Sequence, residues 1–315
     1  MLLSILIPTY NRSVFLNKNL TMLKSYILDN DLESKVEIVV SNNFSSDDTS
    51  EIIGNFFKDN PTLSILPIHQ SSNIGLLKNA LEVLKNANFE YVMYLGDDDY
   101  IDENYLNGVI THIENNKSTH VVLPSLIEVN IHDEFVKNGR DFELQNSYWD
   151  AGYENCLENG WRGHQLSGLV LKRNGIYDAV KKFRVSNLYI FVFFTAYSCL
   201  KGNTFHYTKF PVRVTNPGQK NKDWNYGEDG LINDLFDNYI NLPLSSWQIT
   251  KLQLKVIESQ PWRLWKYKKV GDKEFLITFK NMWFSKNSTY LFKIAFPLLV
   301  LKIAAKKKLY KLLKS

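Results

Sequence analysis

The chain has few cysteines and lacks the sequence signatures of several common protein classes. Only Cys156 and Cys199 occur among 315 residues, which argues against a disulfide framework and is typical of a reducing compartment. The short apolar N-terminus has no basic residues before it, so we interpret it as a first strand and not as a signal peptide. No Gly-x-Gly-x-x-Gly or Walker A sequence is present, which argues against a dinucleotide cofactor and a P-loop.

Acidic residues are missing from the end of the chain. Residues 290–315 contain seven lysines and no aspartate or glutamate; without these lysines the formal net charge of +4 would be −3. A nucleic-acid-binding protein is expected to carry a basic face spread through its fold. Because the basic residues of this chain are concentrated in one tail, we expect no nucleic-acid partner.

The first hundred residues alternate between two hydrophobic periodicities. Short apolar runs of strand length occur at residues 3–7, 36–40, 63–68 and 91–95, and segments with helical spacing lie between them. This alternation predicts an α/β fold with a parallel, Rossmann-like sheet. Right-handed crossovers would then bring the loops that follow these strands to one edge of the sheet.

The fourth of these runs leads directly into three consecutive aspartates, Asp97, Asp98 and Asp99. Carboxylates at the end of a buried strand are suitable ligands for Mg²⁺ or Mn²⁺, which in turn bind the phosphates of a nucleotide. The structural alternative is a solvated acidic turn that caps the next helix.

Four motifs together resemble a known family. They are LSILIPTYNR at residues 3–12, EIVVSNNFSSDDT at 37–49, NIG at 73–75 and LGDDDY at 95–100. In this order and spacing they are similar to the signatures of family 2 glycosyltransferases, in particular bacterial enzymes that build O-antigens and capsules. The resemblance is strong over residues 1–125, faint over 126–215 and absent beyond. It implies the GT-A nucleotide-diphospho-sugar transferase fold.

The resemblance assigns a donor-binding role to residues in each motif. Asp47 would face the nucleoside or brace its loop, Asn42 stands where the family usually has an aspartate, and Lys78 stands where many members have an arginine. Asp97 and Asp99 would form the family's Asp-x-Asp pair and hold Mn²⁺ or Mg²⁺, with Asp98 as a further candidate. The remaining residues expected around the nucleotide are Pro8, Thr9, Tyr10, Asn73 and Gly75.

The catalytic base is harder to place. We expect a strand at residues 165–173 and a helix after it. Inverting members of the family usually have a Glu-Asp pair at the start of this helix, but the corresponding residues here are Ser186 and Asn187. Neither can act as a general base at neutral pH. Glu228, Asp229 and His164 are the remaining candidates, and each also has an ordinary structural interpretation as a helix cap or a structural histidine.

The C-terminal third predicts helices. We expect a catalytic domain at residues 1–215, with a nucleotide-sugar half (1–125) and an acceptor half (126–215), followed by a helical region at 216–315. The apolar run between Lys293 and Lys302 is far short of the about 20 residues that span a bilayer. Together with the lysines it indicates an interfacial membrane helix, although a docking helix or an oligomer contact is also possible.

The sequence therefore predicts a glycosyltransferase, metal-dependent and inverting, in surface polysaccharide biosynthesis. It would be cytoplasmic, peripheral at the inner face of the cell membrane, and would use a nucleotide-sugar donor and a glycan or lipid-linked oligosaccharide acceptor. The alternatives are a nucleotidyltransferase and a catalytically degraded scaffold of the same fold. The intact aspartate run at residues 97–99 argues against the scaffold.

Overall fold

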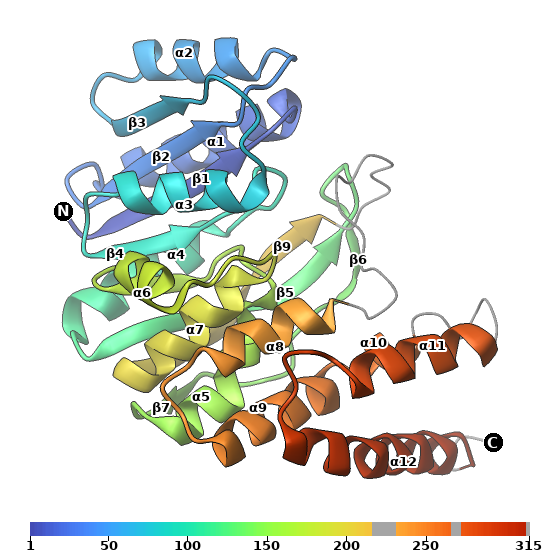
Figure 1. The fold of residues 1–315 in the computed structure, drawn as a ribbon. Helices are drawn as coiled ribbons and strands as arrows, with labels where there is room; N and C mark the ends of the chain where they lie inside the picture. The colour runs from blue at the N-terminus through green and yellow to red at the C-terminus, as the bar shows by residue number, and fades with distance from the viewer. Residues whose placement is uncertain (216–230, 266–271, 313–315) are drawn as a thin grey trace.

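A nine-stranded mixed sheet forms the centre of the molecule (Figure 1). The computed structural model describes residues 1–215, 231–265 and 272–312. The strands follow the order β3-β2-β1-β4-β8-β5-β9-β7, and β6 pairs with β5. Their bounds are β1 Leu3–Thr9, β2 Val36–Asn42, β3 Ser64–His69, β4 Tyr91–Tyr94, β5 Thr119–Val129, β6 Phe135–Asn138, β7 Ser147–Trp149, β8 Val170–Lys172 and β9 Asn203–Thr215.

The predicted alternation of strands and helices is confirmed in the first half of the sheet. Strand β1 is parallel to both β2 and β4, and β2 is parallel to β3. Thr9 and Asn42 are register partners at the ends of β1 and β2, so the loops after these strands leave from the same edge. Beyond β4 the sheet becomes mixed, because β8 runs antiparallel to both β4 and β5.

Helices cover both faces of the sheet. Leu6 of β1 belongs to one hydrophobic cluster, with residues of α3 and α7, whereas its neighbours Ile5 and Ile7 belong to a second, with residues of α1 and α4. This alternation follows from the two-residue period of a strand. The helix bounds are α1 Ser13–Asp29, α2 Thr49–Asp59, α3 Leu76–Asn86, α4 Glu103–Asn115, α5 Tyr153–Asn159, η1 (a 3₁₀ turn) Gly160–His164, α6 Ile176–Phe183, α7 Ile190–Lys201, α8 Ile232–Ile240, α9 Ser246–Ser259, α10 Trp262–Trp265, α11 Asp272–Trp283 and α12 Tyr290–Leu312.

The strand expected at residues 165–173 is shorter than predicted, because only Val170–Lys172 is extended in the sheet. Gly168 has a φ of +76°, and a Cβ atom there would clash with Val212. The Gly168 N–H donates to the Tyr94 carbonyl at 2.8 Å. The chain therefore turns before β8, and His164 lies in η1 and not at the start of a strand.

The C-terminal region is helical, as predicted, and shares a core with the sheet. Phe292, Phe296 and Val300 of α12 belong to the same cluster as residues of α7, α8 and α9. Pro297 lies inside α12 and cannot donate to the Lys293 carbonyl. The Trp283 indole Nε1 donates to that carbonyl at 2.6 Å instead, which ties α11 to α12. Among the residues that the structure describes, none of the helices combines the length and apolar character needed to cross a bilayer.

Candidate active site

The loops after β1, β2 and β4 meet at the carboxyl edge of the sheet, as the sequence predicted. Thr9 Oγ1 donates to Asp97 Oδ2 at 2.7 Å, which joins the end of β1 to the acidic turn after β4. The Asn11 N–H donates to Ser45 Oγ at 2.9 Å, and the Ser46 N–H donates to Asn11 Oδ1 at 2.8 Å. The three loops therefore form one connected surface.

Asp47 braces this surface from the β2 side. Its carboxylate accepts from the Ser13 N–H at 3.0 Å and from the Thr49 N–H at 3.1 Å. Partial burial alone would raise the pKa of Asp47, but the hydrogen bonds from Thr49 and Ser13 lower it below its usual value. Asp47 thus stays ionised and links the β2 loop to the start of α1.

Three asparagines organise the neighbouring loop. Asn42 is buried and its Oδ1 accepts from the Ser45 N–H at 2.9 Å. Asn43 Nδ2 donates to Asn73 Oδ1 at 2.9 Å, and Asn43 Oδ1 accepts from the Ile74 N–H at 2.8 Å. Asn73 Oδ1 also accepts from the N–H of Gly75, whose φ is +82°. The loop before α3 is therefore held against the end of β2 by amide side chains.

Three further residues that were expected to bind the nucleotide-sugar lie around the same edge of the sheet: Pro8, Tyr10 and Lys78. Pro8 and Tyr10 are half-buried at and just after the end of β1. Lys78 is exposed on the first turns of α3. An exposed lysine so placed offers a flexible positive charge for a phosphate group.

The acidic turn is clamped from two sides. Asn19 is buried in α1, and its Nδ2 donates to the Gly96 and Asp99 carbonyls, both at 3.0 Å. Ser167 Oγ accepts from the Gly96 N–H at 3.0 Å and donates to Asp99 Oδ2. The Thr215 N–H donates to Asp99 Oδ1 at 2.8 Å, and Arg12 lies 3.9 Å from Asp98.

Burial and neighbouring charges alter the pKa of Asp97. Burial is the largest cause, and the charges of Asp98 and Asp99 act in the same direction, so that the pKa is raised to about 7 although the Thr9 hydrogen bond and the Arg12 charge oppose the rise. A cation placed beside Asp97 would favour the ionised form of its carboxyl group.

The donor set matches one particular kind of metal site. Within residues 1–215, 231–265 and 272–312, no group of three or more His, Cys, Asp or Glu side chains is arranged to enclose a metal ion. Mg²⁺ is commonly held by one or two carboxylates together with substrate phosphates, and not by an all-protein cage. Asp97 and Asp99 are oriented by Thr9 and Ser167. They fit a site in which two carboxylates and the phosphates of a substrate hold the metal together.

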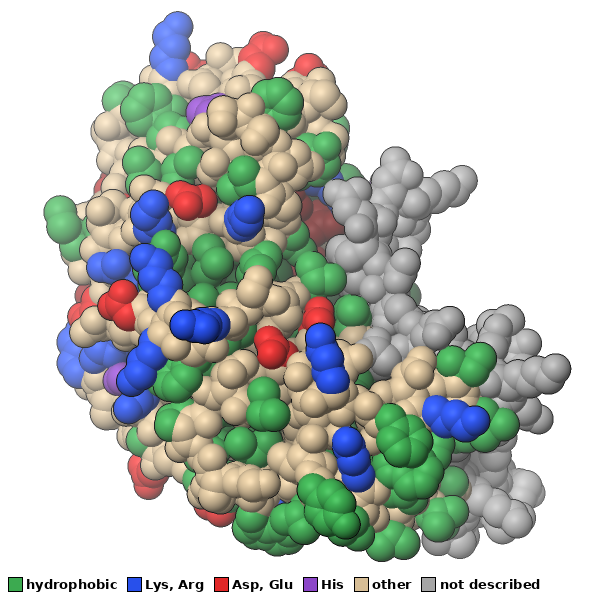
Figure 2. Space-filling view, viewed as in Figure 1, with side chains coloured by type: hydrophobic (Ala, Val, Ile, Leu, Met, Phe, Trp, Pro, Cys, Tyr) green, Lys and Arg blue, Asp and Glu red, His purple; other side chains and the backbone are tan. Residues whose placement is uncertain are grey.

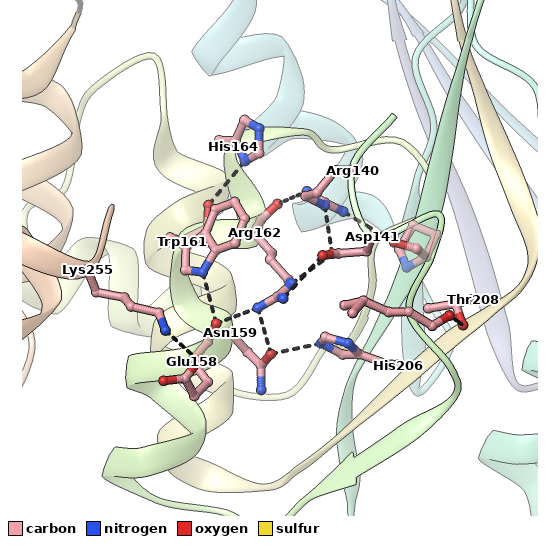
Figure 3. Close-up of polar contacts among 12 residues, drawn as sticks. Arg140, Asp141, Glu158, Asn159, Trp161, Arg162, His164, His206, Thr208 and Lys255 are labelled. Atoms are coloured by element: carbon pink, nitrogen blue, oxygen red, sulfur yellow. Dashed lines mark hydrogen bonds and ion pairs between the residues drawn. The ribbon is translucent and has the colours of Figure 1, made fainter. Parts of the chain in front are cut away.

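His164 belongs to a polar network around η1 (Figure 3). Its Nδ1–H donates to the Trp161 carbonyl at 3.2 Å, and its ring stacks on that of Trp161. Burial lowers the pKa of His164 well below its usual value, and the charges of Arg140, Arg263 and Arg162 act in the same direction. A histidine with so little affinity for a proton is a poor general base at neutral pH.

The centre of the same network is a buried ion triad. Asp141 accepts from Arg140 Nε at 3.1 Å and from Arg162 Nε at 2.7 Å, and Figure 3 shows both arginines pointing to it. Asn159 Oδ1 accepts hydrogen bonds from Arg162 Nη1 at 3.1 Å and from His206 Nε2 at 2.8 Å. The triad holds the chain that precedes Ser167, and so supports the clamp on Asp99.

The position where family members have an acidic pair is bordered by carboxylates from helix α8. Glu228 and Asp229 lie outside the described residues. Asn187 is buried and its Nδ2 donates to Asp237 Oδ2 at 2.9 Å, while the Leu188 N–H donates to Asp234 Oδ2 at 3.3 Å. Two carboxylates of α8 therefore lie beside the position where the sequence has Asn187 in place of an acid.

Sequence reasoning missed Asn19, Asn43, Ser167 and Thr215, which fix the loops and the turn. Asn19 alone had a detectable signal, because it interrupts the apolar face of a helix between Leu16, Leu20 and Leu23. Asn43 lies inside the motif at residues 37–49 but had been given no role, and Ser167 and Thr215 lie in an ordinary polar loop and at a strand end. Their importance depends on which distant residue they contact.

Comparisons with known proteins agree with this geometry. A model of glycosyl transferase family 2 matches residues 4–179. Abequosyltransferase RfbV of Salmonella typhimurium strain LT2 is 25% identical over 226 residues, which cover 68% of this chain and 66% of that protein. The GalNAc(5)-diNAcBac-PP-undecaprenol beta-1,3-glucosyltransferase of Campylobacter jejuni is 32% identical over 153 residues, which cover 47% and 46%. The matched segments thus span about two thirds of the length of the first relative and less than half of the second.

Solved structures with the same fold include two bound to nucleotide-sugars. Residues 1–349 of S. aureus TarS with UDP-GlcNAc superpose with a TM-score of 0.63 at 16% identity, covering 90% of this chain and 80% of that one. The mannosyltransferase PcManGT of Pyrobaculum calidifontis with GDP-Man and Mn²⁺ has a TM-score of 0.54 at 12% identity, covering 90% and 87%. At these identities the likeness establishes the fold.

Proposed function

The chain belongs to glycosyl transferase family 2, and on that premise we propose that it transfers a sugar from a nucleotide-sugar donor to a saccharide acceptor. The observation that carries the proposal is the meeting of Thr9, the β2 loop and the acidic turn at one edge of the parallel half of the sheet. Ligands of open α/β sheets bind beyond the carboxyl ends of the strands. All three elements lie inside the span that the family model matches.

We propose that the donor lies across this edge. The loops of Pro8, Thr9 and Tyr10 and of Asn42, Asn73 and Gly75 would surround the nucleoside, and Lys78 would approach the diphosphate. Asp97 and Asp99 would hold Mn²⁺ or Mg²⁺ with the diphosphate oxygens, and the cation would stabilise the leaving nucleoside diphosphate. Arg12 and Asp98 lie beside this pair.

For the transfer step we propose inversion. The acceptor hydroxyl would attack the anomeric carbon opposite the diphosphate while a carboxylate takes its proton. Glu228 and Asp229 stay candidates for this base, and Asp234 and Asp237 join them because they lie beside Asn187. His164 is the weakest candidate, since its surroundings lower its pKa.

We further propose a biological setting. The two relatives are an abequosyltransferase and a glucosyltransferase that is named for a saccharide linked to undecaprenol through a diphosphate. By analogy, this chain would act in O-antigen or capsule biosynthesis on a lipid-linked oligosaccharide at the inner face of the cell membrane. Residues 1–125 would bind the donor and 126–215 the acceptor. The basic tail of the helical region at 216–315 would associate with the membrane.

A thermal-shift panel tests the donor site. UDP, GDP, CDP, dTDP and their common sugars are compared with and without Mn²⁺. A ligand at about one hundred times its Kd adds about 2.7 kcal/mol, which for a chain of this size raises the Tm by about 5 °C. We expect one of these nucleotides to raise the Tm, and only when Mn²⁺ is present.

Matched variants make the panel specific. Asp99→Asn should abolish the metal-dependent shift, whereas Asp59→Asn, an exposed aspartate at the end of α2, should retain it. Absence of a shift with every nucleotide would refute the donor site and favour a degraded scaffold. Binding of a nucleoside triphosphate with release of pyrophosphate would favour a nucleotidyltransferase.

A further inference from the structure

Helix α12 has two apolar faces, and only one of them is covered. Phe292, Phe296 and Val300 are buried against the rest of the molecule. On the opposite side lies a row of exposed residues that we call the outer stripe: Leu291, Ile294, Leu298 and Leu301. With 3.6 residues per turn these four fall within an arc of about 80°, facing away from the buried row.

The outer stripe is unusually exposed for aliphatic side chains. Ile294 is 56% exposed, and Leu298 and Leu301 are each 67% exposed. Tyr290, at the start of the same helix, is 77% exposed. Figure 2 shows hydrophobic side chains grouped along the lower edge of the molecule, where Figure 1 places α9 and α12. A contiguous exposed apolar row of this kind indicates a contact surface.

The helix cannot be a loose tail that folds only on contact. Its inner row shares a core with α8 and α9, and Trp283 of α11 donates to its Lys293 carbonyl. Lys302 pairs with Glu258 of α9 at 3.0 Å. The outer stripe is therefore a rigid, preformed part of the folded molecule.

Charge decides which partner suits this stripe. Residues 290–315 contain seven lysines and no acidic residue. Lys302 and Lys306 are exposed immediately beyond Leu301. Two copies of the chain meeting through this helix would bring like charges together, whereas an anionic lipid surface complements apolar and basic residues at once.

We infer that the outer stripe of α12 lies in the interfacial layer of an anionic membrane, with the helix parallel to the bilayer and docked on its own protein. Leu291, Ile294, Leu298 and Leu301 enter the boundary between headgroups and acyl chains, and the exposed Lys306 contacts the lipid phosphates. The inference concerns a surface other than the donor site. It rests on the membrane location given under the proposed function and names the surface responsible, but it can hold or fail whether or not the chain transfers a sugar.

Vesicle flotation of the full chain tests this directly. The probes are vesicles of phosphatidylcholine alone and vesicles enriched in phosphatidylglycerol, each at low and high NaCl. We expect flotation with the anionic vesicles, weakened by salt. Leu298→Gln with Leu301→Gln should weaken partitioning about tenfold, because two inserted side chains are lost.

A control pair separates the stripe from general surface hydrophobicity. Phe135 and Val136 of β6 are 61% and 49% exposed, and Phe135→Gln with Val136→Gln should float like the wild type. Circular dichroism checks that each variant is folded, and Leu301→Gln alone provides a milder version. The inference is overturned if the wild type does not float with anionic vesicles or if both pairs behave alike. It is also overturned if the wild type forms a dimer that the α12 pair dissociates.

Discussion

At the scale of single residues, the candidate site depends on side chains that orient other side chains. One carboxylate oxygen of Asp99 accepts a hydrogen bond from the Ser167 hydroxyl, and the other accepts one from the Thr215 N–H. The Asn19 amide donates to the Asp99 backbone carbonyl. Outer partners of this kind fix the direction of a metal-binding carboxylate and are often nearly as important as the ligand itself. Small polar residues outside the four motifs therefore contribute to the proposed donor site.

Ser167→Ala should weaken metal-dependent nucleotide binding about 10- to 100-fold, because Asp99 loses an orienting hydrogen bond and the Gly96 N–H loses its acceptor. Unfolding free energy should fall by only about 1 kcal/mol. Calorimetric titration with the nucleotide identified in the thermal panel measures the first quantity, and urea unfolding the second. The exposed Ser34 provides a control, and equal affinity of Ser167→Ala and Ser34→Ala would contradict the role of the clamp.

His206 should make the protein sensitive to acid. Burial, together with the charges of Arg162 and Arg140, lowers the pKa of His206 to about 3 against the opposing charge of Asp141. Between the usual histidine pKa of about 6.5 and this value the unfolded chain binds a proton that the folded chain refuses. Stability should therefore fall as pH drops through this window, by up to about 1.4 kcal/mol per pH unit.

The measurement is urea unfolding at a series of pH values. His206→Asn should flatten the decline at low pH, whereas substitution of the exposed His69 should leave it unchanged. If the slopes of wild type and His206→Asn coincide, His206 is not the group responsible.

At the scale of elements, glycines and a proline interrupt regular strands and helices at points where two elements contact each other. The turn at Gly168 shortens β8 and delivers Ser167 to the acidic turn. In η1, a Cβ on Gly163 would collide with the Phe191 carbonyl, so the absence of a side chain lets this turn pack closely on α7. In α12, Pro297 frees a carbonyl that α11 uses for docking.

Trp283→Phe should lower the unfolding free energy by about 1 kcal/mol or slightly more, because the Lys293 carbonyl loses its donor while most of the apolar contact remains. The control is Trp247→Phe, since Trp247 is 56% exposed. In a Pro297→Ala background the new backbone N–H can bond to Lys293. Trp283→Phe should then cost less, and an unchanged cost in this double-mutant cycle would contradict the interpretation.

At the scale of the whole molecule, the sheet and the C-terminal helices form one cooperative structure. One hydrophobic cluster extends from Leu6 of β1 through Phe194 of α7 and Phe236 of α8 to Phe292 and Phe296 of α12. The proposed membrane surface is therefore built directly on the helices that pack against the proposed catalytic sheet.

A chain that ends after Thr289 should be severely destabilised throughout. Loss of Phe292, Phe296 and Val300 removes about 5 kcal/mol or more of hydrophobic burial, comparable to the total stability of many domains. Circular dichroism melting should show one transition at a much lower temperature, and not a stable sheet that has lost only its last helix. A chain ending after Leu312 is the control, and an unchanged Tm in the shorter chain would show that α12 is dispensable.

The sequence alone determined the pattern of strands and helices in the first half, the family resemblance and the acidic run, because each is recorded in periodicity or in contiguous motifs. It also indicated the basic, apolar C-terminal helix. Only the tertiary structure decided that Ser167 and Thr215, 68 and 116 residues from Asp99, hold its carboxylate. It likewise decided that α12 is docked through one face and leaves the other exposed. Such contacts depend on the path of the chain in space, and no local pattern of residues encodes which distant partner a small polar side chain will meet.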